Sequence, residues 1–133
     1  MERIRMLKIA PLEAPRLIEV DHTLENLQEL VGGTIQALYP WEDLCCILCD
    51  DNGKAKGYPA NRILEDEEGN PYDIIVGTFY ICGLTRDDFA SIPNDLAEKY
   101  TEKYRYPEMF MRTEKGHVIM FRLGSGEPPV RLF

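Results

Sequence analysis

Asn61 and Arg62 are adjacent side chains whose types are suited to holding an anion. Arg62 is the only basic residue between Lys56 and Arg86, in a stretch rich in acids. A guanidinium can donate two parallel hydrogen bonds to a phosphate or a carboxylate, and the Asn61 amide can add a further donor. The alternative is an ion pair between Arg62 and a neighbouring carboxylate, which would order the acidic loop at residues 65–73. The sequence leaves both roles open.

Four further residues complete the predicted ligand site. Gly32 and Gly33 can present backbone N–H groups to an anion, because a glycine lets the backbone approach a ligand closely. Tyr58 can stack on a base, and Thr78 ends the same stretch of the chain. The predicted ligand is therefore a small anionic molecule such as a nucleotide signal. Stacking on a ligand and packing in the core are alternative roles for the aromatic residues near loop ends: Tyr39, Trp41, Tyr58 and Tyr72.

The chain has four cysteines, and their spacing formally allows a metal or redox site. Cys46 and Cys49 match a C-x-x-C pair, but the two residues between them are apolar and strand-forming, whereas a zinc knuckle needs a turn. Cys45 and Cys46 are adjacent, so on a strand their side chains point to opposite faces and cannot share a metal. We expect buried thiols in a reduced protein, with no metal and no cofactor.

The sequence contains no strong catalytic motif. It lacks the phosphate-binding loop of nucleotide hydrolases, the glycine fingerprint of dinucleotide sites and the nucleophile elbow. His22 and His117 lie 95 residues apart at predicted surface positions, and an isolated histidine needs a base, nucleophile or metal beside it to act in catalysis. The acidic loop at residues 65–73 lacks the alternating oxygen ligands of a calcium loop. We therefore expect that the protein is not an enzyme.

The charge of the chain is distributed unevenly. The 133 residues carry a net charge of −8, and all of it belongs to residues 1–82, which hold 15 acids and 7 bases. Residues 83–133 hold 8 acids and 8 bases. An acidic surface repels nucleic acid, so we expect no direct nucleic-acid binding. Two kinds of partner remain: a basic protein, or a small anionic ligand held in a local positive pocket.

Length and composition predict a globular protein. A chain of 133 residues with 44% hydrophobic and 29% charged residues can bury a core without a disulfide or a metal. Its longest apolar run, at residues 44–49, is far too short to span a membrane, and no apolar signal segment follows the N-terminus. We expect a cytoplasmic protein with no membrane partner. A single α+β domain should occupy residues 1–123, followed by a Gly/Pro-rich C-terminal tail at residues 124–133.

The hydrophobic pattern predicts the elements that would position these residues. Thr23 is a candidate N-cap for a short amphipathic helix that ends at Gly32 and Gly33, and a second helix is expected over residues 95–104. The fold should be α+β, with a mostly antiparallel sheet of five to seven strands and two or three short helices. Apolar or alternating runs bounded by turn residues predict strands at 3–9, 16–20, 34–39, 44–50, 56–64, 74–82, 109–113 and 117–123.

The order and spacing of four motifs carry a resemblance. These are Gly32-Gly33, the turn at residues 51–54, Asn61-Arg62 and Gly77-Thr78. In this pattern the chain resembles a family of small acidic bacterial and phage proteins of unknown function, carried on conjugative elements and phages of Firmicutes. The resemblance covers roughly residues 4–123. It implies a setting, mobile-element cargo that counters host defence, and no established activity.

Three functional hypotheses follow. The first is a non-enzymatic mobile-element or phage protein that binds or sequesters a small anionic ligand in a conflict with host defence. The alternative is an acidic interaction module that occupies the basic face of a host defence or restriction protein. A hydrolase or transferase with a cryptic site is the third. Residues 130–133 could also pair with an edge strand of a second copy and form a homo-oligomer, or remain a mobile terminus.

Overall fold

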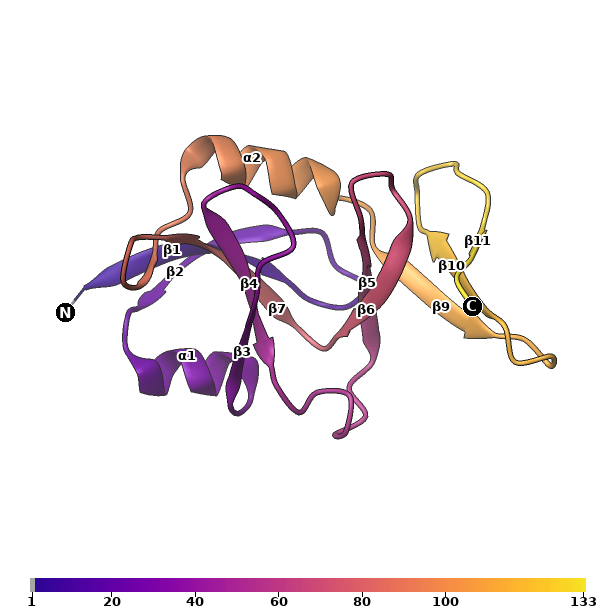
Figure 1. Cartoon of the computed structure of the whole chain (residues 1–133), viewed down its shortest axis with the longest axis horizontal. Coiled ribbons are helices and arrows are strands. Elements are labelled where there is room, and N and C mark those ends of the chain that lie inside the picture. The colour runs from indigo at the N-terminus through magenta and orange to yellow at the C-terminus, as the bar shows by residue number, and fades with distance from the viewer. Residues whose placement is uncertain (1) are drawn as a thin grey trace.

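The computed structural model describes residues 2–133, over which the chain forms two helices and eleven strands (Figure 1). Neither helix in this range has the length and apolar character needed to span a membrane. In chain order the elements are β1 (Arg3–Ile9), β2 (Arg16–Asp21), α1 (Leu24–Val31), β3 (Ile35–Leu38), β4 (Cys45–Asp50), β5 (Ala60–Glu65), β6 (Pro71–Val76), β7 (Phe79–Leu84), β8 (Phe89–Ala90), α2 (Asn94–Lys103), β9 (Glu108–Arg112), β10 (Val118–Arg122) and β11 (Val130–Arg131).

The largest sheet has six strands in the order β2-β1-β7-β4-β3, with β8 paired to β7. All of its neighbouring strands are antiparallel. β1 and β2 form the predicted hairpin, in which Arg3 lies opposite Asp21 and Lys8 opposite Arg16. The predicted α+β class, with mostly antiparallel strands and two helices, is therefore confirmed.

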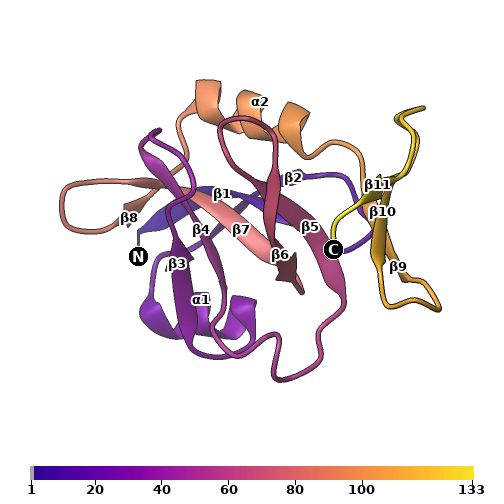
Figure 2. The same cartoon turned by 45° about the vertical axis from the view of Figure 1, so that its right-hand side comes forward.

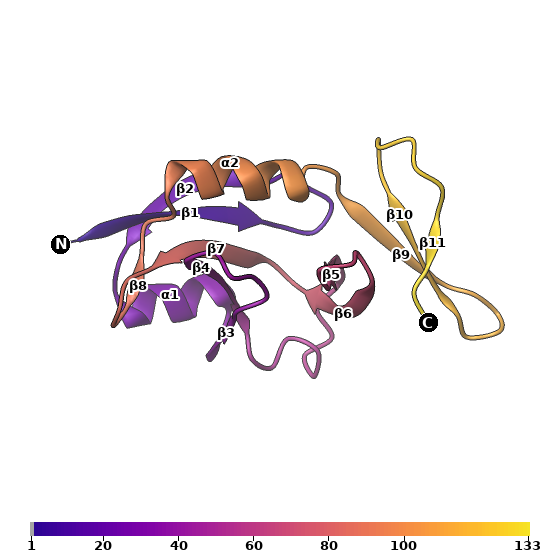
Figure 3. The same ribbon diagram turned by 45° about the horizontal axis from the view of Figure 1, so that its top comes forward.

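One helix lies on each face of this sheet (Figure 3). On one face α1 contributes the buried side chains of Leu27 and Val31. On the other face α2 contributes Tyr100, and Tyr104 follows directly after the helix. A strand between two such layers needs apolar side chains on both faces, which explains why all six residues of β4 are buried.

The four cysteines lie in this core as free thiols, as predicted. Cys45 and Cys49 pack on the α2 side, and burial raises the pKa of each thiol to about 11. Cys46 and Cys82 pack on the α1 side, directly opposite each other on β4 and β7, with their Sγ atoms 3.7 Å apart. Residues 2–133 contain no group of three or more His, Cys, Asp or Glu side chains that could hold a metal.

The strand predicted over residues 56–64 begins later than expected, at Ala60. Residues 51–57 form consecutive turns, in which the N–H of Lys56 donates to the carbonyl of Asn52 and the N–H of Gly57 to that of Lys54. β5 then pairs with β6 in a separate two-stranded sheet beside the central one (Figure 2). The turn signal was thus correct, but the turn is longer than a tight hairpin.

The C-terminal strands form a third sheet in the order β11-β10-β9, which extends away from the rest of the chain (Figures 1 and 3). β9 and β10 are the predicted hairpin, with Met120 opposite Phe110. The tail does not hang free, because β11 pairs with β10 of the same chain and the N–H of Leu132 donates to the carbonyl of Val118.

Helix α1 begins and ends as its sequence predicts. The Thr23 Oγ1 accepts a hydrogen bond from the N–H of Asn26 at 3.1 Å, which satisfies one of the free donors of the first turn. Gly32 has a φ of 95° and its N–H donates to the carbonyl of Gln28, as in a left-handed C-cap.

The N-cap gives a first prediction. Thr23→Ala should lower the free energy of unfolding by about 1 kcal/mol, because the N–H of Asn26 loses its acceptor. Urea denaturation followed by circular dichroism would measure this. Thr101→Ala, on the exposed face of α2, is the matched control and should change stability by less than about 0.5 kcal/mol. Equal losses in the two variants would contradict a specific capping role.

Candidate functional site

Arg62, the predicted anion-binding residue, is fully buried, with 0% of its surface exposed. Its Nη2 atom donates to the carbonyls of Glu13 at 2.7 Å and Tyr104 at 2.9 Å. Its Nη1 atom donates to the side-chain oxygen of Asn61 at 2.8 Å. Burial lowers the pKa of the Arg62 guanidinium, while the nearby Glu108 carboxylate partly opposes that shift. In this arrangement the guanidinium contacts internal oxygens and no ligand from solution can reach it.

Asn61 is equally buried, and its side chain has no free hydrogen-bonding atom. Its Nδ2 atom donates to the carbonyls of Ile9 at 2.9 Å and Gly77 at 2.8 Å. Its side-chain oxygen accepts the bond from Arg62. Asn61 and Arg62 therefore join β5 to β1, to the β6–β7 turn and to the residue after α2. The alternative role of Arg62 was an ion pair with a neighbouring carboxylate. Among the described residues no ion pair includes Arg62.

Gly32, Gly33 and Tyr58 do come together, around the buried carboxylate of Asp50. The Tyr58 hydroxyl donates to the Asp50 carboxylate at 2.9 Å, and the Lys56 ammonium donates to it at 2.7 Å. Lys56 also donates to the carbonyl of Gly32 at 2.9 Å. The hydrogen bond from Lys56 to the Asp50 carboxylate holds the pKa of Asp50 below its usual value. The cluster ties the end of α1 to the turn before β5, and its charges satisfy each other.

Thr78 lines a shallow hollow of about 340 Å³ beside the same cluster. Tyr58 and Thr78 line it together with Leu30, Val31 and other apolar residues. A Cβ at Gly77 would lie 2.6 Å from the Tyr58 ring, so the turn beside this hollow requires glycine. The structure thus brings four predicted residues into one region, Gly32, Gly33, Tyr58 and Thr78, while Asn61 and Arg62 lie beneath the surface. The ligand role proposed for these residues stays a prediction.

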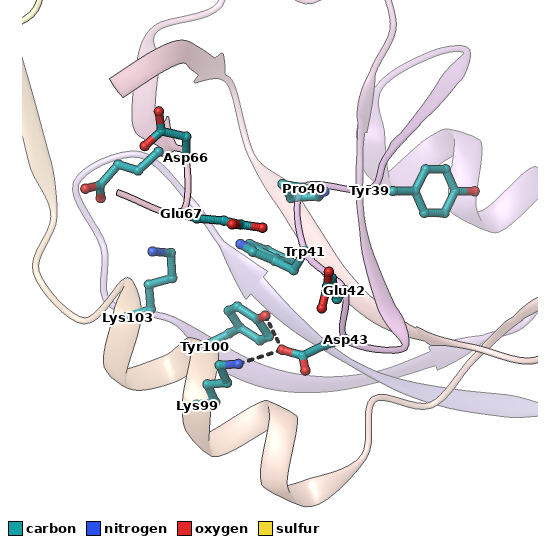
Figure 4. Close-up of a pocket in the computed structure, with 11 residues that line it drawn as sticks. Tyr39, Pro40, Trp41, Glu42, Asp43, Asp66, Glu67, Lys99, Tyr100 and Lys103 are labelled. Carbon is teal, nitrogen blue, oxygen red and sulfur yellow. Dashed lines mark hydrogen bonds and ion pairs between the residues drawn. The ribbon is translucent and has the colours of Figure 1, made fainter. Parts of the chain in front are cut away.

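A larger hollow lies elsewhere, between the β3–β4 loop, the β5–β6 turn and α2 (Figure 4). It is a groove of about 580 Å³. Trp41 lies against Tyr100, with ring centroids 4.1 Å apart, and 6.4 Å from the ring of Tyr104. The groove therefore has an aromatic floor built from residues about sixty positions apart in the chain.

Carboxylates dominate the walls of this groove. A second hollow of about 460 Å³ shares several of its residues and extends it past the exposed ring of Tyr72. We call the combined surface the acidic groove. It is lined by six carboxylates (Glu42, Asp43, Glu65, Asp66, Glu67, Glu68), two lysines (Lys99, Lys103), four aromatic residues (Tyr39, Trp41, Tyr72, Tyr100) and Pro40.

Some of these charges are already neutralised within the chain. Asp43 accepts hydrogen bonds from Lys99 at 2.7 Å and from the Tyr100 hydroxyl at 2.6 Å, which lower the pKa of its carboxyl. Burial and the Asp43 contact raise the pKa of Tyr100, so its hydroxyl stays protonated. Glu65 is paired with Arg122 at 3.2 Å. Glu42 and Glu67 are exposed, and no ion pair of the described residues includes them.

The titratable groups of the acidic groove are carboxylates, lysines and tyrosines. Neither histidine lines it: His22 contacts Glu2 at 2.7 Å, a bond that raises the pKa of the imidazole, and His117 lies 3.3 Å from the carbonyl of Phe133. The sequence signals for this groove were the acidic run at residues 65–68 and the single tryptophan. The sequence did not show that α2 would bring Lys99, Tyr100 and Lys103 to the same place.

Comparison with known proteins identifies the family. The model of a family described as "Domain of unknown function (DUF3846)" matches residues 4–105, and the chain belongs to this family. The matched region includes the central sheet, both helices and the β5–β6 hairpin, and it ends before β9. No curated protein and no solved structure matches the chain. The family description names no activity, so function has to be argued from the acidic groove.

The burial of Arg62 gives a second prediction. Arg62→Met should lower the free energy of unfolding by about 3 kcal/mol or more, because the Tyr104 carbonyl and the Asn61 side-chain oxygen would lose a charged donor while buried. Urea denaturation would measure the loss. Arg86→Met, at an exposed position, is the control and should stay within about 0.5 kcal/mol. A loss below about 1 kcal/mol for Arg62→Met would contradict the structural role.

Proposed function

We propose that this member of the family is a non-enzymatic interaction module whose acidic groove receives a basic segment of a partner protein. The observation that carries the proposal is the combination of six carboxylates with an aromatic floor in one groove. A basic side chain can lie over an aromatic ring and pair with carboxylates at the same time. Such a groove therefore offers arginine or lysine side chains an aromatic ring and carboxylates together.

Trp41 and Glu67 provide a ring and a carboxylate for one basic side chain of the proposed partner. Both residues line the groove, and in the view of Figure 4 the Trp41 ring is drawn between the Glu67 side chain and Tyr100. Trp41 is only partly buried, so part of its ring remains open to a partner. A guanidinium placed there would stack on the ring and donate to the carboxylate.

The two lysines of the groove do not reverse its charge. Lys99 pairs with Asp43 at 2.7 Å, and the Lys103 ammonium lies 5.8 Å from the Tyr104 ring centroid. With Arg62 buried, no arginine lines the groove. Within this groove these facts support a basic partner over a small anionic ligand, because an anion would meet a surplus of carboxylates.

The partner class follows from this charge. A host defence or restriction protein that binds nucleic acid has a basic face, and the setting implied by the family resemblance, mobile-element cargo in conflict with a host, includes such proteins. We propose a protein of this class as the partner of the acidic groove. The affinity would come from charge pairs at the rim and from packing on Trp41.

Trp41 supplies a direct test, because it is the only tryptophan of the chain. An octa-arginine peptide without aromatic residues should change the Trp41 fluorescence in a saturable way. Raising the salt from about 50 to about 300 mM shortens the screening length from about 14 to about 6 Å, and should weaken binding several-fold. No saturable change at low salt would contradict the proposal.

Matched variants separate the groove from general acidity. Glu42→Gln with Glu67→Gln should weaken peptide binding about 5- to 30-fold, since each exposed pair contributes about 0.5–1 kcal/mol. Glu25→Gln with Glu29→Gln removes the same charge from exposed positions of α1, on the other face of the sheet, and should change binding little. Equal effects of the two double variants would mean that peptide binding depends only on the net charge of the protein.

A rise in the melting temperature of the protein with ATP would instead favour the small-anion hypothesis.

A further inference from the structure

The C-terminal sheet carries an uncovered apolar face. Met109 lies opposite Phe121, and Met111 lies opposite Ile119, so these four side chains project from the same side of the sheet. Arg131 on the short edge strand β11 lies opposite Ile119 and borders this side with an exposed charge. Met109 is 40% and Met111 52% exposed, and Ile119 and Phe121 are half-buried. We call these four residues the apolar face.

The other side of the same sheet is fixed to the body of the protein. Met120 and Glu108 are buried there, with exposed fractions of 1% and 4%. The Glu108 carboxylate accepts the N–H of Ile63 on β5 at 2.8 Å, and Arg122 binds Glu65 at 3.2 Å. The sheet is therefore held against β5 by one side, which leaves the apolar face directed outward.

Charge distinguishes this sheet from the rest of the chain. Residues 1–105 hold 20 acids and 11 bases, a net charge of −9, whereas residues 106–133 hold three acids and four bases, a net charge of +1. Two bodies with nine negative charges each repel one another. The C-terminal sheet is the part of the chain that two copies could bring together with least repulsion, and Figures 1 and 3 show that it extends away from the acidic body.

We propose that two copies of this chain associate symmetrically through the apolar face, sheet against sheet. In such an arrangement the same four side chains on each copy pack against their counterparts, as a two-fold interface requires. The segment lies beyond the residues matched by the family, so this interface would be an addition to the family domain. The tail is not the contact, because β11 is already paired with β10 of its own chain.

The size of the face sets the expected strength. β9 and β10 have five residues each and are about 17 Å long, whereas β11 has two residues. With strands about 5 Å apart the sheet is about 14 Å wide, so each copy contributes a few hundred Å². A standard interface buries about 800 Å² on each partner. We therefore expect a reversible dimer whose population rises with protein concentration.

Sedimentation velocity over about a hundredfold range of protein concentration tests the proposal. The wild-type chain should shift from monomer to dimer, and Met111→Lys should remain a monomer throughout, because two buried ammonium groups would face each other. Leu24→Lys, at a 61% exposed position of α1, is the matched control and should dimerise like the wild type. A wild-type chain that stays monomeric, or a Leu24→Lys variant that behaves like Met111→Lys, would overturn it.

Salt distinguishes this contact from binding in the acidic groove. An apolar interface between two acidic chains should persist or strengthen at high salt, because screening reduces the repulsion of the bodies. A dimer that dissociated at high salt would overturn the proposal. It would instead indicate that a basic segment of one copy binds in the acidic groove of another. Circular dichroism would confirm that each variant is folded, and Met109→Lys on the same face would replace Met111→Lys if that variant did not fold.

Discussion

The buried guanidinium of Arg62 is the interaction on which the arrangement of the other parts depends. It joins β5 to the β1–β2 loop through the Glu13 carbonyl and to the residue after α2 through the Tyr104 carbonyl. A buried charge is costly unless every partner is present, so removing any one of them leaves a large unfavourable term. The segments that contribute these oxygens are therefore constrained to move together. This is why an arginine in an acidic stretch does not need a ligand to explain it.

The same constraint builds the acidic groove. Three residues after Arg62, β5 ends at Glu65 and leads into the acidic turn that forms one wall. Tyr104, which accepts the other hydrogen bond, follows the helix that supplies Lys99 and Tyr100 to the opposite side. A cation inside the protein thus positions the carboxylates outside it. The placement of Arg62 inside the protein and of the acidic turn on its surface therefore follows from the packing of β5 and α2, and the acidic turn also has a proposed role in binding.

The C-terminal sheet is attached at the same place. Arg122 on β10 contacts Glu65, Glu108 and Glu127, and the buried Glu108 accepts the N–H of Ile63 beside Arg62. Burial raises the pKa of Glu108, while Arg122 and the Ile63 N–H oppose that shift by favouring its charged form. β5 is therefore the junction between the family domain and the added sheet. The groove and the apolar face are supported by one strand but differ in chemistry, and the two proposed contacts differ accordingly.

The sequence by itself determined the local structure and the fold class. The caps of α1, the β1–β2 and β9–β10 hairpins and the burial of the thiols all depend on neighbouring residues or on the pattern of one element, which a sequence displays directly. The tertiary structure alone decided what Arg62 contacts and where the groove lies. Glu13 and Tyr104 are 49 and 42 residues from Arg62, and Trp41 meets Tyr100 across the chain. Whether an arginine is a ligand-binding group or an internal support depends on such distant partners, because burial and hydrogen bonding are set by packing between elements and not by residue type.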